Sequence, residues 1–322
     1  MRRYLLTRLG SALLLLLLVV SATFVLLHAL PGDPVQALDN PRLTLAQREQ
    51  LRRAFGLDRP LAVQYLAWIR SALLHFDWGV SFVQQRPVSE VLGQALPNTL
   101  LLAAAALPLE YGLGLLLGVA AARRAGRAAD HWIRGGALLL YSLPVFWLAL
   151  MAILALCLKL PLFPPSHMYS PAAQDLPPFA RLLDLLHHLA LPAIVLALAS
   201  AGGIARFVRA NLLDAMGQEY LRAARAKGLS ERRVLWTHGM RNALPPLLQV
   251  FGVHLPAMLA GSLVVEVVFS WPGMGRLTYD AVLARDFPVV LACTAWHGLL
   301  VVTGGLLADL LHAAVDPRVR DA

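Results

Sequence analysis

Six long apolar segments, separated by shorter polar stretches, dominate the sequence. They run from about Leu9 to Leu30, Asn98 to Ala122, Ile133 to Leu160, His188 to Val208, Pro245 to Phe269 and Pro288 to Ala314. A helix rises about 1.5 Å per residue, so about 20 apolar residues cross the hydrocarbon core of a bilayer. Each segment reaches that length. The pattern therefore predicts an all-α polytopic membrane protein with six transmembrane helices.

Residues 31–97 form a long segment between the first and second predicted spans, and two short amphipathic helices are expected in it. Thr44 and Gln47 have the spacing of a capping box, and Gly56 can end the first helix in a left-handed cap. Pro60 suits the first turn of the second helix. The apolar face of that helix is expected to hold Ala62, Leu66, Ile69 and Leu73. A later loop, Pro161 to His187, is rich in proline and is expected to be irregular.

Basic residues lie next to the ends of the predicted spans, which indicates their orientation. The formal net charge is +9, and the arginines gather in short groups at Arg2, Arg3 and Arg8, at Arg123, Arg124 and Arg127, from Arg206 to Arg241, and at Arg318 and Arg320. Lys and Arg favour the cytoplasmic side of a membrane, so both termini are expected in the cytoplasm and residues 31–97 outside. A nucleic-acid partner is not expected, because the arginines form no basic face with interleaved aromatic residues.

The N-terminal span is predicted to remain as a membrane anchor, although Arg2 and Arg3 imitate a signal sequence. Its apolar run exceeds the roughly 7 to 15 residues of a cleavable core, and Pro31 directly after Leu30 is a poor cleavage context. Cys157 and Cys293 lie in apolar runs and are expected to be core residues.

The segment 211–243, between the fourth and fifth spans, predicts a rigid helix-turn-helix. Good helix formers run from Asn211 to Lys227, and Gly228 can end that helix in a left-handed cap. Ser230 is placed to cap a second helix that continues to about Ala243, where Pro245-Pro246 is expected to end it. A solvated, arginine-rich loop is the alternative. The ordered cap residues and the small residues 223–226 favour a docking surface.

The same segment resembles the coupling loop of permease subunits of ATP-binding-cassette (ABC) importers, in the form used by the dipeptide, oligopeptide and nickel branch. The matching residues are Glu219-Tyr220, Ala224-Arg225-Ala226-Lys227-Gly228-Leu229-Ser230, Val234, His238 and Arg241-Asn242-Ala243. The resemblance implies that contact with the ATPase is made by Glu219, Tyr220, Ala223, Ala224, Arg225, Ala226, Lys227, Gly228, Ser230, His238, Arg241 and Asn242. Further matches are Leu30-Pro31-Gly32-Asp33-Pro34, Leu96-Pro97-Asn98-Thr99, Ser142-Leu143-Pro144 and the run from Val265 to Leu277. Arg222 departs from the general importer pattern, which has an acidic residue there.

The resemblance implies a type I ABC importer permease fold and a set of partner proteins. These partners are a second homologous permease subunit, two cytoplasmic ATPase subunits, an extracytoplasmic solute-binding protein and membrane lipid. The expected organisation is an anchor helix (1–30), an external amphipathic segment (31–97), a permease core (98–314) with its cytoplasmic coupling loop (211–243), and a cytoplasmic tail (315–322). A bacterial or archaeal cell membrane is expected, the inner membrane in a Gram-negative source.

The segment after the fifth predicted span and the single residue Glu110 are further candidates for function. Trp271 suits a membrane interface, Pro272-Gly273 breaks the helix after the fifth span, and Leu277, Ala281 and Val282 predict a short helix. An external gate or binding-protein contact is expected at Trp271, Pro272, Gly273, Gly275 and Arg276. Glu110 lies near the middle of the second span, where a carboxylate costs about 2.5 to 3.5 kcal/mol on insertion scales. It is expected either to form a structural hydrogen bond or to line the translocation pathway.

Three other classes of protein receive less support from the residues. The lysines, Lys159 and Lys227, do not lie in a phosphate-binding loop, so ATP hydrolysis is expected in partner subunits. A hydrolase is disfavoured because Ser142 and Ser200 have no evident base partner, and an ion-coupled carrier because Glu110, Glu266 and Asp309 are scattered. No cofactor and no metal site are expected. Peptides are the favoured substrate, with nickel or another small solute as the alternative on account of lone His28, His254, His297 and His312.

Overall fold

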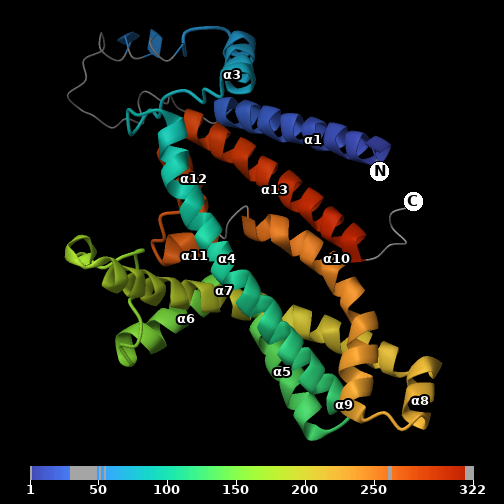
Figure 1. The fold of residues 1–322 in the computed structure, drawn as a ribbon. Coiled ribbons are helices and arrows are strands. Elements are labelled where there is room, and N and C mark those ends of the chain that lie inside the picture. Colours follow the sequence, from blue (N-terminus) through green and yellow to red (C-terminus); the bar gives the residue numbers. More distant parts are fainter. Residues whose placement is uncertain (1, 30–48, 51, 54–55, 260–262, 316–322) are drawn as a thin grey trace. The chain divides into compact units, whose positions relative to one another are not determined.

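The computed structural model of the chain describes residues 2–29, 49–50, 52–53, 56–259 and 263–315 (Figure 1). Their regular structure is helical, and the β pairing within them is limited to one bridge between Val80 and Pro87. The predicted all-α class is therefore confirmed. The chain forms two compact units, one made of Met1–Thr99 and Pro272–Leu300, and the other of Leu100–Trp271 and Val301–Ala322.

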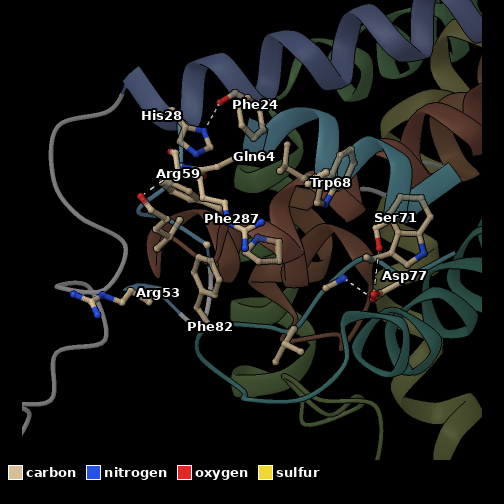
Figure 2. A pocket seen from close by; sticks show the side chains of 18 residues that line it. Phe24, His28, Arg53, Arg59, Gln64, Trp68, Ser71, Asp77, Phe82 and Phe287 are labelled. Carbon is tan, nitrogen blue, oxygen red and sulfur yellow. Dashed lines mark hydrogen bonds between the residues drawn. The ribbon is translucent and has the colours of Figure 1, made fainter. Parts of the chain in front are cut away.

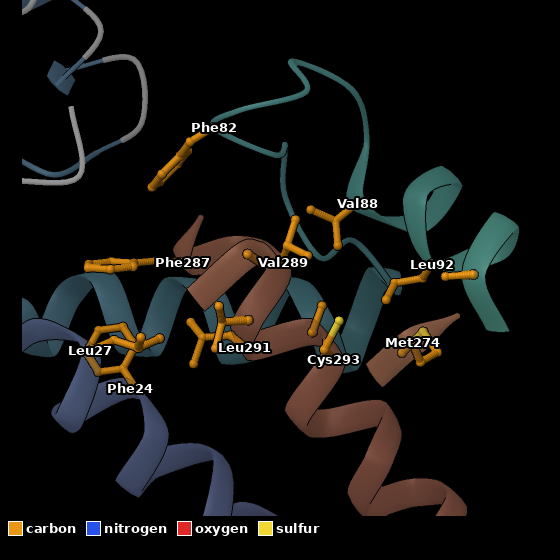
Figure 3. Close-up of a cluster of buried hydrophobic side chains, with 14 residues drawn as sticks. Phe24, Leu27, Phe82, Val88, Leu92, Met274, Phe287, Val289, Leu291 and Cys293 are labelled. Carbon is orange, nitrogen blue, oxygen red and sulfur yellow. The ribbon is translucent and has the colours of Figure 1, made fainter. Parts of the chain in front are cut away.

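The first unit is built on the membrane helix α1 (Arg2–Ala29) and on the start of α13 (Phe287–Val315). It also contains α3 (Leu61–His75), the beginning of α4 (Val88–Arg123) and α12 (Met274–Leu283). Side chains from four of these helices share one buried apolar cluster (Figure 3), which includes Phe24, Leu27, Val88, Leu92, Met274, Phe287, Val289, Leu291 and Cys293. Close packing of these side chains holds the helices of the unit together.

Helix α3 forms where the second external helix is predicted, but its buried face differs from the expected one. Leu66 and Leu73 are exposed, whereas Ala72 is buried and Tyr65 and Trp68 pack against the core. The two aromatic rings offer more apolar surface than the leucines, so they take the inner positions. Before α3, Gly56 has φ +67, and the Leu57 N–H donates to the Arg52 carbonyl, which confirms the predicted left-handed helix end. Thr44 and Gln47 lie outside the described residues.

The second unit consists of helices that follow α4 along the chain. They are α5 (Ala128–Ser142), α6 (Val145–Ala152), the π-helical η2 (Ile153–Lys159), the short η3 (Ala173–Asp175), α7 (Pro178–Met216), α8 (Glu219–Ala226), α9 (Glu231–Arg233), the π-helical η4 (Val234–Gly239), α10 (Met240–Leu259) and α11 (Leu263–Val268). Two glycines allow close helix packing. A Cβ on Gly202 of α7 would lie 2.2 Å from the Ala137 carbonyl oxygen, and one on Gly118 of α4 would lie 2.7 Å from that of Ala205. Small residues at such contacts are typical of membrane helices.

The structure supports four or five of the six predicted spans. Among the described residues, Gly10–Ala29, Val88–Arg123, Pro178–Met216 and Phe287–Leu307 are long and apolar enough to cross a membrane. The predicted third span is a helix pair, Ala128–Ser142 and Val145–Lys159, bent by 102°. Leu143 is extended there because the following Pro144 disfavours a helical conformation before it. The predicted fifth span corresponds to α10 and α11, which are not among these candidates. The described part of this segment is interrupted at residues 260–262, so the fifth span stays a prediction.

Three predicted boundaries are wrong. Helix α7 begins at Pro178, so only part of the loop Pro161 to His187 is irregular, and a proline in the first turn suits that start. The helix expected from Asn211 to Lys227 breaks at Gln218, whose ψ of 148° is extended. Helix α10 continues through Pro245-Pro246 instead of ending there. Prolines are tolerated within membrane helices, where neighbouring groups can satisfy the freed carbonyls.

Candidate functional site

Residues 219–239, which form α8, α9 and η4, fold back on themselves and are called the loop hairpin here. Its turn is made by Gly228, which has φ +78. The Gly228 N–H donates to the Arg225 carbonyl, and the Leu229 N–H donates to that of Ala224. Only glycine adopts this conformation without steric penalty. The predicted left-handed end at Gly228 is therefore confirmed.

The loop hairpin has a small core and a cross-turn ion pair that hold its two arms together. Leu221, Ala224 and Val234 are buried, and Met216 and Leu229 pack against them. Across the turn, Arg225 Nε donates to Glu231 Oε1 at 2.7 Å. Because Ala224 points into this core, the small-residue face is presented by Ala223 and Ala226, which are exposed.

Exposed basic and aromatic side chains cover the outside of the loop hairpin. Glu219, Tyr220, Lys227 and Trp236 are exposed, and an open groove of about 360 Å³ lies among Ser230, Arg232, Arg233, Trp236 and Thr237. Ser230 occupies the predicted N-cap position, although its side chain makes no capping hydrogen bond. His238 is partly buried in η4, and Arg241 and Asn242 lie in the first turn of α10, where Arg241 is exposed. The hairpin thus combines a packed interior with a basic outer face.

A buried ion pair that was not predicted from the sequence joins α5 to α7. Arg209 donates from Nε and Nη2 to the two carboxylate oxygens of Asp130, each at 2.7 Å, and the Gly126 N–H donates to Asp130 as well. The Asp130 side chain is 1% exposed. Such a bidentate pair fixes the orientation of both side chains. In the sequence, the pair could have been suspected from the position of Asp130, an acidic residue that closely follows the basic residues Arg123, Arg124 and Arg127.

Glu110 has a partner within the second unit. His254 Nδ1 lies 2.9 Å from Glu110 Oε1, and because a carboxylate accepts, the imidazole donates. Glu110 is 0% exposed, whereas His254 of α10 is 36% exposed. Within the described residues, Glu110 Oε2 and the neighbouring Tyr111 hydroxyl have no hydrogen-bond partner. This burial favours the structural interpretation of Glu110, and a pathway role stays a prediction.

Trp271 follows α11 after Phe269 and Ser270, and its side chain is fully buried, so the expected interface position of this residue is wrong. Its ring packs among apolar side chains of the second unit, which provide more apolar contact than an interface would. Helix α12 then forms as predicted, with Ala281 buried and Leu277 packed on the core, but with Val282 exposed.

Helix α12 is attached to the start of α4 within the first unit. The Met274 N–H donates to Thr99 Oγ1 at 2.7 Å, and Asn98 Nδ2 donates to the Pro272 carbonyl at 2.8 Å. Arg276 pairs with Asp280 at 3.6 Å. A groove of about 260 Å³ runs along this junction, lined by polar side chains that include Gln84, Arg86, Gln94, Asn98, Arg276 and Asp280. Gly273 also lines it, and Gly275 is a buried residue of α12.

Comparison with known proteins identifies a family over nearly the whole chain. A family described as "Binding-protein-dependent transport system inner membrane component" matches residues 114–321, and the N-terminal component of such systems matches residues 1–103. The oligopeptide transport system permease protein AppB of Bacillus subtilis is 40% identical over 320 residues, 99% of each chain. The dipeptide transport system permease protein DppB of Escherichia coli is 35% identical over 337 residues, again 99% of each chain.

The fold agrees with this family. The MetNI methionine ABC transporter, in an inward-facing structure of its CY5 native crystal form, matches with a TM-score of 0.53 and 17% identity. The match covers 71% of this chain and 97% of that chain. The family model and the relatives above define a permease of the ABC transporter class, and the apolar helices agree with a multi-pass membrane protein. The chain belongs to the family of binding-protein-dependent transport system inner membrane components.

Proposed function

We propose that this chain is the permease subunit of an ABC importer for di- or oligopeptides and that separate ATPase subunits drive it through the loop hairpin. The observation that carries the coupling role is the construction of the hairpin. Its interior is packed, Gly228 sets its turn, and its exposed side chains are basic and aromatic. A rigid projection of this kind can transmit a push from a partner to the helices on either side, α7 and α10.

The assembly that follows contains a second homologous permease, two cytoplasmic ATPases and an extracytoplasmic solute-binding protein. The family description as a binding-protein-dependent system supports this set of partners. In this arrangement residues 211–243 and both termini lie in the cytoplasm, because the basic groups of the chain lie next to those segments. The polar groove along α12 and the start of α4 then faces outward and receives the solute-binding protein.

Peptides are proposed as the substrate because the relatives named above carry oligopeptide or dipeptide transport in their names. Nickel receives no comparable support. Within the part of the chain that the structure describes, no three His, Cys, Asp or Glu side chains come close enough to hold a metal ion.

Reconstitution tests this proposal. The chain is co-expressed with its companion permease and ATPases, purified as a complex, and placed in liposomes with the loaded solute-binding protein. Uptake of a labelled tripeptide is expected only with ATP and with this chain present. Uptake in liposomes that lack this chain, or transport by the chain as a monodisperse single protein, would contradict the proposal.

A further inference from the structure

A cavity of about 710 Å³ lies within the first unit, among the end of α1, helix α3, residues 77–82 and the start of α13 (Figure 2). Its volume is in the range of pockets that hold small ligands. Its lining includes no residue of the loop hairpin or of α12, and neither Glu110 nor His254. The transport function proposed above therefore leaves this cavity without a role.

The cavity lies at the ends of two candidate membrane spans. Phe24 and His28 line it from the last two turns of the span Gly10–Ala29. Phe287 lines it from the first turn of the span Phe287–Leu307. The end of an apolar span marks the level at which lipid hydrocarbon gives way to headgroups. A ligand in this cavity would therefore meet the bilayer at its interface, where Trp side chains such as Trp68 are typically enriched.

Two buried polar atoms of the lining residues have no partner among the described residues, namely Trp68 Nε1 and His28 Nε2. His28 Nδ1 lies 2.8 Å from the Phe24 carbonyl oxygen, which can only accept, so Nδ1 carries the hydrogen. In the neutral ring Nε2 is then an acceptor. Buried polar groups are nearly always satisfied. A ligand that accepts from Trp68 and donates to His28 would satisfy both atoms.

The charged residues of the lining favour an anionic ligand. Arg53 and Arg59 line the cavity, and neither has an ion-pair partner within the residues that the structure describes. The carboxylate of Asp77 is already engaged, because it accepts from the Gly79 N–H at 2.9 Å and from Ser71 Oγ at 3.3 Å. Guanidinium groups bind phosphate well. The rest of the lining is largely apolar and aromatic, with Phe82 and Phe287 among its side chains (Figure 2).

We propose that this cavity binds one phospholipid with an anionic, hydroxyl-bearing headgroup of the phosphatidylglycerol type. The phosphate is held by Arg59 and by the Trp68 N–H, and a headgroup hydroxyl donates to His28 Nε2. The upper parts of the acyl chains pack on Phe24 and Phe287. The bound lipid joins α1 to α3 and α13 at the membrane interface, independently of the transported substrate.

Native mass spectrometry of the complete importer complex tests this site. The complex is exchanged into nanodiscs with equal amounts of phosphatidylglycerol and phosphatidylethanolamine, and the ratio of the two lipids retained per complex is measured. Arg59→Gln is expected to lower that ratio about tenfold, the effect of losing one charge-assisted hydrogen bond. Trp68→Phe, which keeps an aromatic ring but removes the N–H, is expected to lower phosphatidylglycerol retention as well.

Matched controls separate a local site from a general loss of lipid. Arg70→Gln changes an exposed arginine of α3 that does not line the cavity, and Trp132→Phe changes an exposed tryptophan of α5. Both should retain the wild-type ratio. Ala67→Phe fills the cavity without changing charge and should expel the lipid, which keeps the test valid if Trp68→Phe folds poorly.

Three results would overturn the proposal. The first is an unchanged lipid ratio in Arg59→Gln and Ala67→Phe, and the second is an equal fall in the controls. The third is that the mass bound to the purified complex proves to be a peptide and not a lipid. None of these results bears on ATP-dependent peptide uptake, so the two proposals fail separately.

Discussion

His254 Nδ1 donates to Glu110 Oε1 over 2.9 Å, which joins α10 to α4 through a carboxylate that has no exposed surface. Either polar side chain alone would be unfavourable in the membrane interior. The imidazole supplies a hydrogen-bond donor to the carboxylate, and the carboxylate supplies an acceptor to the imidazole. The pair therefore explains how an acidic residue is tolerated in the middle of the second predicted span.

Removal of the His254 imidazole should lower the thermal stability of the complex more than removal of the charge on Glu110. His254→Leu leaves a buried carboxylate without this hydrogen-bond donor, a change that typically costs about 1.5 to 3 kcal/mol. Glu110→Gln keeps the shape and part of the hydrogen bonding, so it should assemble normally. The thermal midpoint of the purified complex measures the difference. If Glu110 also lines the pathway, Glu110→Gln will lower peptide uptake at normal assembly. Unchanged uptake would leave Glu110 with a structural role alone.

Gly228→Val should uncouple ATP hydrolysis from transport while leaving membrane insertion intact. A β-branched residue resists the φ of +78 at this turn, so the two arms of the loop hairpin would shift. Gly228→Asn is the matched control, because asparagine tolerates the left-handed region. The measurement is ATPase stimulation by loaded solute-binding protein. Wild-type stimulation in the valine variant would argue against a rigid hairpin.

Arg209→Lys should lower the thermal midpoint of the complex, although the charge is kept. Lysine cannot reproduce the two parallel hydrogen bonds to Asp130, and such a replacement is not conservative at a bidentate site. Arg123→Lys changes an exposed arginine at the end of α4 and should leave the midpoint unchanged. Equal effects of the two substitutions would show that the ion pair does not stabilise the contact between α5 and α7.

Helix α12 should change its accessibility during the transport cycle. Tyr279 is exposed and suits a cysteine probe, whereas Met274 is fully buried and does not. Labelling of Tyr279→Cys is expected to change when an ATP analogue traps the complex. Leu73→Cys on α3 is an exposed control and should label equally in both states. Unchanged labelling at Tyr279 would make α12 a passive connector.

Much of this architecture could be predicted from the sequence, because its signals are local. Apolar length located most of the spans, and Gly56 and Gly228 marked helix ends, since their conformations depend on neighbouring residues. What could not be predicted depends on packing at a distance. The inner face of α3, the burial of Trp271 and the Asp130–Arg209 pair arise from residues far apart in the chain. The continuation of helix α10 through Pro245-Pro246 was not predicted, because adjacent prolines suggest the end of a helix in water. Membrane helices tolerate such prolines.

The central claim is that the exposed face of the loop hairpin contacts the ATPase subunits, and cross-linking at two adjacent alanines tests it most directly. Ala223 is exposed and Ala224 is buried, so cysteines at these positions differ in accessibility within the same helix. In the assembled complex, a short bifunctional thiol reagent should link Ala223→Cys to a single cysteine introduced on the ATPase surface. Ala224→Cys should remain unlinked. Absence of a link from Ala223→Cys in an intact, active complex, or equal linking from both positions, would contradict the account.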